Sequence, residues 1–258
     1  MLPFVKITSK DNSIIKLAAK LQTSGRSRRE HGLFVIEGLR LCRDAAENGY
    51  DFEYLLVSET AFGKYSDTVE MLAASAKKCC VLFDSVFSKI SDTTNPQGIM
   101  CLCAFGDKHY EIKKDGKYIA LENINDPSNL GAVSRTAEAF GLDGIILSAD
   151  GCDPYSPKSL RASMGALLRL PVIVLDDFAC ELSESGLALY ACVVDRDAKS
   201  VTDVTFEKGS VALIGNEANG LTDRAVSVST PVTIKMTGRA ESLNAAVAAS
   251  IVMWEMQR

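Results

Sequence analysis

The chain has 258 residues, of which 47% are hydrophobic and 24% are charged, and its formal net charge is −5. These values exclude a disordered, collagen-like or coiled-coil chain, and they fit one large or two modest globular domains. The longest apolar run covers residues 245–254, about half of the roughly 20 residues that a membrane helix needs. Residues 1–10 carry no apolar signal core, so we expect a cytoplasmic protein with no membrane partner.

The eight cysteines lie mostly within apolar stretches and form no C-x-x-C pair. Only two histidines, His31 and His109, could join them in a metal site. Reduced, buried thiols in a cytosolic protein explain this pattern better than a disulfide framework or a zinc site does. We therefore expect no bound metal.

The first part of the chain alternates helical and strand patterns, which predicts a small α/β domain over residues 1–106. The apolar spacing predicts a helix over 14–21 and another that opens at 37–41. Short apolar runs predict strands at 33–36, 54–57, 80–83 and 98–105. Residues 107–116 are polar, bounded by glycines and without apolar periodicity, which indicates a linker.

The second part, residues 117–258, alternates more strongly. Apolar runs of four to eight residues, separated by helical segments, predict a mostly parallel sheet with both faces covered. The predicted strands are 118–124, 144–147, 172–175, 187–194, 211–214 and 232–234. Ligands on such sheets bind beyond the carboxyl ends of the strands, so the loops that follow strands are the candidate sites.

The first such loop, residues 123–137, leads into a helix that Pro127 and Ser128 are expected to start. Arg135 lies about 140° around this helix from Leu130, away from the expected buried stripe. The alternative interpretation is an exposed Arg135 that pairs with Glu138 at i+3.

The second loop, residues 213–221, follows a buried strand and carries an acid, Glu217, between two turn residues, Asn216 and Gly220. A tight strand-to-helix turn that needs small residues is the alternative interpretation. The third loop, within residues 234–251, contains a glycine and leads to a helix that we expect to begin near Ser242. The alternative here is a capped helix of the core. One face of this helix carries Leu243, Val247, Ile251 and Trp254.

Each loop alone is a weak signal, but the three in this order resemble the three sequence motifs of the SpoU branch of the SPOUT RNA methyltransferases, also called the TrmH family. The resemblance covers residues 118–258. Within it, a further stretch at residues 156–166 also looks like the family, and residues 34–41 and 91–98 look like that family's substrate-binding domain.

The resemblance implies a C-terminal α/β domain with a deep trefoil knot, preceded by a smaller domain of the ribosomal-protein L30e type that holds RNA. It also implies a homodimer with the active site at the interface, and S-adenosylmethionine bound in the knot. By their position in the motifs, six residues are expected to line the cofactor pocket: Leu213, Gly215, Ile234, Met236, Leu243 and Asn244.

The implied reaction is methyl transfer to a ribose 2′-hydroxyl. In the family, the residue that matches Arg135 is proposed to assist loss of the hydroxyl proton. Because guanidinium stays protonated, Arg135 could instead hold the ribose-phosphate and stabilise alkoxide charge, and the sequence leaves both roles open. Asn129 and Asn244 would orient groups around it, Glu217 would position Arg135 or the ribose, and Ser242 would begin the last helix beside the reacting atoms.

The implied partner is RNA, most simply ribosomal RNA. Residues 1–31 hold seven Lys or Arg against two acids, a local excess that can track phosphates, although a solvated polar helix face explains it equally well. The candidate RNA contacts are Arg26, Arg28, Arg29, Arg40 and Arg161. The alternatives are a transfer-RNA ribose methyltransferase, a non-catalytic RNA-binding protein of the same fold, a base-methylating relative and an unrelated α/β enzyme.

Overall fold

A computed structural model describes residues 4–105 and 110–258, which divide into two compact units. The first unit is Met1–Lys108 with Tyr155–Arg161, and the second is His109–Pro154 with Ala162–Arg258. Residues 106–109, at the end of the first expected domain and in the expected linker, lie outside the described residues, and residues 110–116 form neither helix nor strand. The domain boundaries suggested by the sequence therefore stay a prediction.

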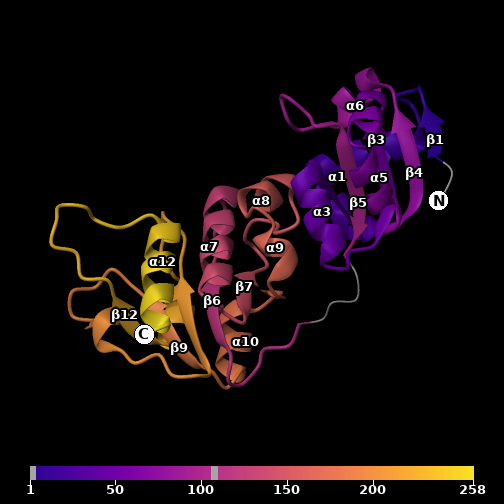
Figure 1. The fold of residues 1–258 in the computed structure, drawn as a ribbon. Helices are drawn as coiled ribbons and strands as arrows, with labels where there is room; N and C mark the ends of the chain where they lie inside the picture. The colour runs from indigo at the N-terminus through magenta and orange to yellow at the C-terminus, as the bar shows by residue number, and fades with distance from the viewer. Residues whose placement is uncertain (1–3, 106–109) are drawn as a thin grey trace. The chain divides into compact units, whose positions relative to one another are not determined.

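The first unit contains a five-stranded sheet in the order β1-β4-β3-β5-β2. β1, β4 and β3 run parallel, whereas β5 runs antiparallel to both of its neighbours. In chain order, the elements of Figure 1 are β1 (Phe4–Ile7), α1 (Ser13–Thr23), α2 (Gly25–His31), β2 (Leu33–Glu37), α3 (Leu39–Glu47), β3 (Phe52–Ser58), α4 (Glu59–Lys64), α5 (Ser66–Ala73), β4 (Ala76–Leu82), α6 (Asp84–Ile90) and β5 (Ile99–Ala104). α8 (Pro157–Ala162) also lies largely in this unit.

One hydrophobic core cluster of the first unit lies between one sheet face and helices α1 and α6. Ile15 and Leu21 of α1, together with Phe87 of α6, pack on Leu56 and Met100 of the sheet. All four expected strands and both expected helices are present here. β1, α2, α4, α5 and α6 were not predicted, because each has at most eight residues and is too short to show a period.

The second unit contains a seven-stranded sheet in the order β10-β12-β9-β11-β6-β7-β8, and all its strand pairs are parallel. This confirms the mostly parallel α/β sheet that the sequence predicts. The elements are β6 (Lys117–Leu121), α7 (Pro127–Ala139), β7 (Gly144–Ser148), α9 (Ala166–Arg169), β8 (Val172–Leu175), α10 (Phe178–Glu184), β9 (Ala188–Cys192), β10 (Lys199–Ser200), the 3-10 helix η1 (Val201–Asp203), β11 (Ser210–Ile214), α11 (Asp223–Ser227), β12 (Thr230–Thr233) and α12 (Ala245–Met256).

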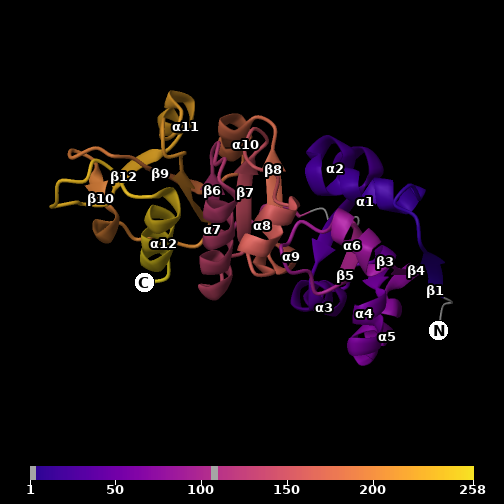
Figure 2. The ribbon, with the colours of Figure 1, turned by 90° about the horizontal axis from the view of Figure 1, so that it is seen from above.

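Helices cover both faces of this sheet (Figure 2). α10 and α11 lie on one face, where Phe178, Leu182 and Ala225 pack against strand residues such as Tyr118 and Leu213. α7 and α12 lie side by side on the other face. The neighbouring strands β12, β9, β11 and β6 end at one edge, so the loops that follow them meet there.

The last helix begins later than expected, at Ala245 instead of near Ser242. Asn244 is the N-cap, and its side-chain oxygen accepts hydrogen bonds from the amides of Ala246 and Val247. Asparagine is among the strongest N-caps, which accounts for the shift. The buried face of the helix consists of Ala245, Ala246, Ala249, Val252, Met253 and Met256.

The predicted apolar face of this helix, with Val247 and Trp254, is partly exposed in the chain by itself. Val247 is 48% exposed and Trp254 is 56% exposed. The spacing identified a continuous apolar face but could not show what covers it. None of the described helices is both long enough and apolar enough to cross a membrane.

Candidate active site

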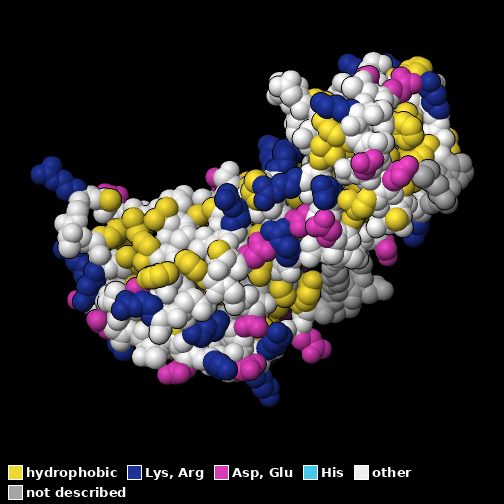
Figure 3. All heavy atoms as spheres, in the orientation of Figure 1, with side chains coloured by type: hydrophobic (Ala, Val, Ile, Leu, Met, Phe, Trp, Pro, Cys, Tyr) yellow, Lys and Arg dark blue, Asp and Glu magenta, His cyan; other side chains and the backbone are white. Residues whose placement is uncertain are grey.

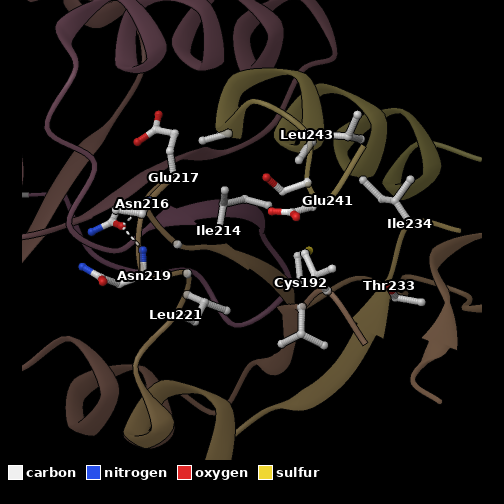
Figure 4. A pocket seen from close by; sticks show the side chains of 18 of the residues that line it. Cys192, Ile214, Asn216, Glu217, Asn219, Leu221, Thr233, Ile234, Glu241 and Leu243 are labelled. Atoms are coloured by element: carbon white, nitrogen blue, oxygen red, sulfur yellow. Dashed lines mark hydrogen bonds between the residues drawn. The ribbon is translucent and has the colours of Figure 1, made fainter. Parts of the chain in front are cut away.

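A cavity of about 520 Å³ lies at the edge of the sheet where β9, β11 and β12 end (Figure 4). The loops after these three strands and the start of α12 form its walls, and this volume is typical of a small-molecule site. The lining residues are Cys192, Val193, Val194, Ile214, Gly215, Asn216, Glu217, Ala218, Asn219, Gly220, Leu221, Thr233, Ile234, Met236, Glu241, Ser242, Leu243, Ala245 and Ala248.

The loop after β11 folds tightly back on itself. The Asn216 side-chain oxygen accepts hydrogen bonds from the amides of Ala218 and Asn219, at 3.0 and 2.8 Å. A Cβ atom on Gly215 would lie 2.0 Å from the Gly220 carbonyl carbon, so no other residue fits at position 215. The tight turn that needs small residues, given above as the alternative to a functional role, is therefore present, and it forms part of the cavity wall.

A buried carboxylate fixes the far end of this loop. Glu122, at the end of β6, is 5% exposed. Its two oxygens accept hydrogen bonds from the Thr222 amide at 2.8 Å and the Thr222 hydroxyl at 2.7 Å. Thr222 in turn caps α11. The loop is thus held at both ends, and its backbone groups keep fixed positions around the cavity.

Three predicted catalytic side chains form one hydrogen-bonded chain beside the cavity. The Asn244 amide donates to the Asn129 side-chain oxygen at 3.0 Å, and the Asn129 amide donates to a Glu217 carboxylate oxygen. Asn129 is 8% exposed, so its amide is bonded on both sides in a nearly dry position. The sequence motifs of all three loops therefore meet at one point.

Arg135 lies on α7 with an exposed side chain, as its position off the buried stripe predicts. It does not line the cavity. Glu138, the partner suggested by the alternative interpretation, is instead paired with Arg169, whose guanidinium donates to both carboxylate oxygens. This hydrogen bond and charge hold the pKa of the Glu138 carboxyl below its usual value, against an opposing effect of burial.

Of the six residues expected around the cofactor, four line the cavity: Gly215, Ile234, Met236 and Leu243. Leu213 is instead fully buried within β11, one residue before the strand ends. Asn244 lines a neighbouring groove instead. Ser242 and Glu217 line the cavity although they were predicted as catalytic residues.

Sequence reasoning missed the wall after β9, which consists of Cys192, Val193 and Val194. The sequence predicted the strand β9 but not its place beside β11. Knowledge of that strand order would have identified the carboxyl end of β9 as part of the cavity. Burial raises the pKa of the Cys192 thiol to about 12, so the sulfur is protonated at neutral pH. Glu241, next to Ser242, was missed as well.

A second, more open concavity of about 660 Å³ lies between α7 and α12. Figure 3 shows hydrophobic side chains gathered over this part of the second unit. The groove is lined by Ser128, Asn129, Ala132, Phe140, Asn244, Ala246, Val247, Ser250, Ile251 and Trp254. Asn129 and Asn244 thus lie where this apolar groove approaches the cavity.

The predicted RNA contacts are spread over the first unit. Arg29 and Arg40 are exposed, Arg26 pairs with Glu30 at 2.6 Å, and Arg161 pairs with Asp92 at 2.6 Å. Arg28 differs from the expectation, because it is 4% exposed and donates a hydrogen bond to the Leu21 carbonyl at 2.6 Å. It joins α2 to α1 within the core, so we remove it from the candidate RNA surface.

Comparison with known proteins defines the class. Over 98% of both chains, the fold matches a crystal structure of an RNA 2′-O ribose methyltransferase with a TM-score of 0.79 and 26% identity. An S-adenosylmethionine-bound rRNA methyltransferase from Sinorhizobium meliloti matches 97% of this chain and 96% of its own, with a TM-score of 0.84 and 28% identity. The protein is thus of the RNA methyltransferase class.

Two family models match the sequence, the SpoU rRNA methylase family over residues 116–254 and an MRM3-like substrate-binding domain over residues 12–101. An uncharacterized tRNA/rRNA methyltransferase of Synechocystis is 30% identical over 98% of this chain and 93% of its own. The 23S rRNA (guanosine(2553)-2′-O)-methyltransferase RlmP of Bacillus subtilis is 29% identical over 98% of this chain and 99% of its own. The chain belongs to the SpoU rRNA methylase family, as its motifs predict.

Proposed function

We propose that this protein transfers the methyl group of S-adenosylmethionine to a ribose 2′-hydroxyl of ribosomal RNA. The observation that carries the proposal is the meeting of the three motif loops around one ligand-sized cavity, with the Asn244–Asn129–Glu217 chain at its edge. The similarity to RlmP over nearly the whole chain supports the ribose and the ribosomal RNA.

The cavity fits S-adenosylmethionine in size and chemistry. Its walls combine apolar side chains such as Ile214, Leu221 and Leu243 with the backbone of two glycine-containing turns. Such walls can contact an adenine ring and hydrogen-bond its edges through the main chain. When bound, this cofactor supplies a methyl group already activated on a sulfonium. The main task left to the protein is therefore to place the ribose oxygen in line with the bond between the methyl carbon and the sulfur.

The remaining task is the proton of the 2′-hydroxyl. We propose that Arg135 holds the ribose-phosphate and stabilises the negative charge that develops on the oxygen, because a guanidinium does not readily give up its proton. A substrate phosphate or a water would accept the hydroxyl proton. An Arg135 that assists proton loss directly is the second candidate role, since the family resemblance points to it.

The other motif residues act as positioning groups in this proposal. Glu217 orients the Asn129 amide, and the bond between Asn129 and Asn244 would orient the groups around Arg135 by fixing the starts of α7 and α12. Ser242 lines the cavity beside them and would contact the substrate or the cofactor near the reacting atoms.

We also propose that the protein acts as a homodimer through the groove between α7 and α12. An apolar groove that exposes about half of Trp254 and Val247 favours a protein partner. A two-fold interface suits it because the same patch would be buried on both copies. Such an interface would cover α7, which carries Arg135, and would bring that side chain to an active site shared by the copies.

Sedimentation velocity tests the dimer. Val247→Glu places a charge in the groove at a position that is already exposed, so the chain should fold and the dimer should dissociate. Val228→Glu, at another exposed valine outside the groove, is the matched control and should leave the dimer intact. A monomeric wild-type protein at the concentrations of the methylation assay would contradict the proposal.

Within this function, the first unit holds the RNA through exposed arginines such as Arg29 and Arg40. Arg26 and Arg161 join them if phosphates displace their carboxylate partners. We propose the cytoplasm as the location, because the substrate is ribosomal RNA. The trefoil knot implied by the family resemblance is also part of the proposal.

Mapping of 2′-O-methyl groups in RNA from cells with and without the protein tests the function. Loss of one ribosomal methyl group, restored by the wild-type gene but not by a gene carrying Arg135→Ala, is the expected result. Loss of a methyl group from transfer RNA would favour a transfer-RNA ribose methyltransferase. A methyl group found on a base by mass spectrometry would favour a base-methylating enzyme. An unchanged set of methyl groups, together with binding of RNA by the purified protein, would indicate a non-catalytic RNA-binding protein.

A further inference from the structure

The cavity lining has a pronounced charge asymmetry. It contains two carboxylates, Glu217 and Glu241, and none of the described lining residues is Lys, Arg or His. Glu217 is engaged by the Asn129 amide. Among the described residues, Glu241 has no hydrogen-bond or ion-pair partner, and it is the free negative charge of the cavity.

Glu241 comes from the loop between β12 and α12, immediately before Ser242. In Figure 4 its carboxylate is turned inward, toward Ile214 and Cys192. The Cys192 thiol is protonated and uncharged at neutral pH, so it does not oppose this charge. The two cations of the same loop, Lys235 and Arg239, do not line the cavity, and the Lys235 ammonium lies 3.9 Å from the Asp203 carboxylate.

We propose that Glu241 makes the cavity selective for a cationic ligand, so that it favours S-adenosylmethionine over the product S-adenosylhomocysteine. The inference rests on the proposed function. The two compounds share the adenosine and amino-acid parts and differ at the sulfur, a sulfonium cation before transfer and a neutral thioether afterwards. A carboxylate in the cavity distinguishes them by charge, and the loss of that attraction after transfer favours product release.

The expected size of the effect follows from Coulomb attraction. In a cavity partly open to water, a high effective dielectric constant limits the attraction between a carboxylate and a sulfonium, and we expect a discrimination of about three- to tenfold. A fully enclosed pair would give much more. The effect should weaken with added salt, because the Glu241 side chain is exposed.

Calorimetric titration of the wild-type protein and of Glu241→Gln with three ligands tests the proposal. The ligands are S-adenosylmethionine, S-adenosylhomocysteine and sinefungin, which carries an amine cation in place of the sulfonium. Glu241→Gln should lower the affinity for the two cationic ligands by about three- to tenfold and leave the affinity for S-adenosylhomocysteine unchanged. Glu207→Gln removes an exposed carboxylate of the same unit outside the cavity, and it should change none of the three constants.

Two outcomes would overturn the proposal. An equal loss of affinity for all three ligands would mean that Glu241 contacts a part they share, and unchanged affinities would mean that it contacts none of them. Failure of the wild-type protein to bind any of the three would instead count against the proposed function. Thermal melting of Glu241→Gln verifies that the variant is folded.

Discussion

The side-chain amide of Asn244 donates a hydrogen bond to the side-chain oxygen of Asn129 at 3.0 Å. Asn244 is the N-cap of α12, and Asn129 lies in the first turn of α7. One bond therefore ties together the starts of two helices that are 115 positions apart in the chain. Because Asn129 also binds Glu217 of a third loop, the geometry of the site depends on both asparagines.

Asn244→Ala should lower both stability and function. Loss of the cap should lower the free energy of unfolding by about 1 kcal/mol, and loss of the bond to Asn129 should weaken cofactor binding and methyl transfer. Asn244→Asp separates the two roles, because a carboxylate still caps the helix but cannot donate to Asn129. Denaturant unfolding should show that Asn244→Asp loses stability only through the missing bond to Asn129 and keeps the contribution of the cap, and a methylation assay should show it impaired in activity. Equal activity of both variants with wild type would show that the bond is dispensable.

Arg135→Ala should retain cofactor affinity and lose nearly all methyl transfer. The side chain is exposed and outside the cavity, so its removal should disturb neither the fold nor the cofactor site. Calorimetry and incorporation of labelled methyl groups into RNA measure the two quantities. Arg224→Ala, which removes an exposed arginine of α11 paired with Asp177, is the control and should remain active. Substantial activity of Arg135→Ala would refute the assigned role.

Much of this site could be predicted because its signals are local. Strand ends, the turn around Asn216 and the start of α7 at Pro127 all depend on neighbours in the sequence. Strand order is not local, and for this reason the wall around Cys192, which β9 brings beside β11, was missed. The burial of Arg28 likewise depends on the Leu21 carbonyl on another helix, which charge counting over residues 1–31 could not reveal.

Arg40→Ala should weaken RNA binding and lower its salt dependence. Arg40 is exposed at the start of α3, and removal of one cation that binds a phosphate should reduce the slope of log affinity against log salt by about one. Arg224→Ala, which removes an exposed arginine of the second unit paired with Asp177, is the control and should leave the slope unchanged. Filter binding between low and moderate salt measures both variants. A wild-type affinity that does not vary with salt would leave the basic surface without a role.

Glu37→Gln should loosen the loop over residues 91–98. The Glu37 carboxylate is 8% exposed and accepts hydrogen bonds from the Ser91 hydroxyl at 2.5 Å, the Thr93 hydroxyl at 2.8 Å and the Asp92 amide at 3.2 Å. An amide nitrogen in place of one oxygen leaves at least one part-buried donor without its acceptor, which should weaken the hold on this loop.

Hydrogen exchange followed by mass spectrometry should show faster exchange over residues 91–98 in Glu37→Gln, with cofactor affinity unchanged. Glu53→Gln is the control in the same unit, because Glu53 pairs with the exposed Lys77 and not with this loop. Exchange rates in this loop that are identical in wild type and Glu37→Gln would show that packing, and not the carboxylate, holds the loop.

The Glu138–Arg169 pair should give the second unit a small pH-dependent stability. The Arg169 hydrogen bond lowers the pKa of Glu138 below its ordinary 4.5. The unfolded state therefore binds a proton more readily than the folded state, and the contribution of the pair is complete above about pH 4.5 and is lost as the pH falls through the lowered value. Both side chains are about one-third exposed, so solvent screening limits this contribution to about 1 kcal/mol or less. Denaturant unfolding should show a lower free energy of unfolding for Glu138→Gln than for wild type at pH 7, and this difference should narrow below pH 4.5. A difference that widened with acid would contradict the sign of the pKa shift.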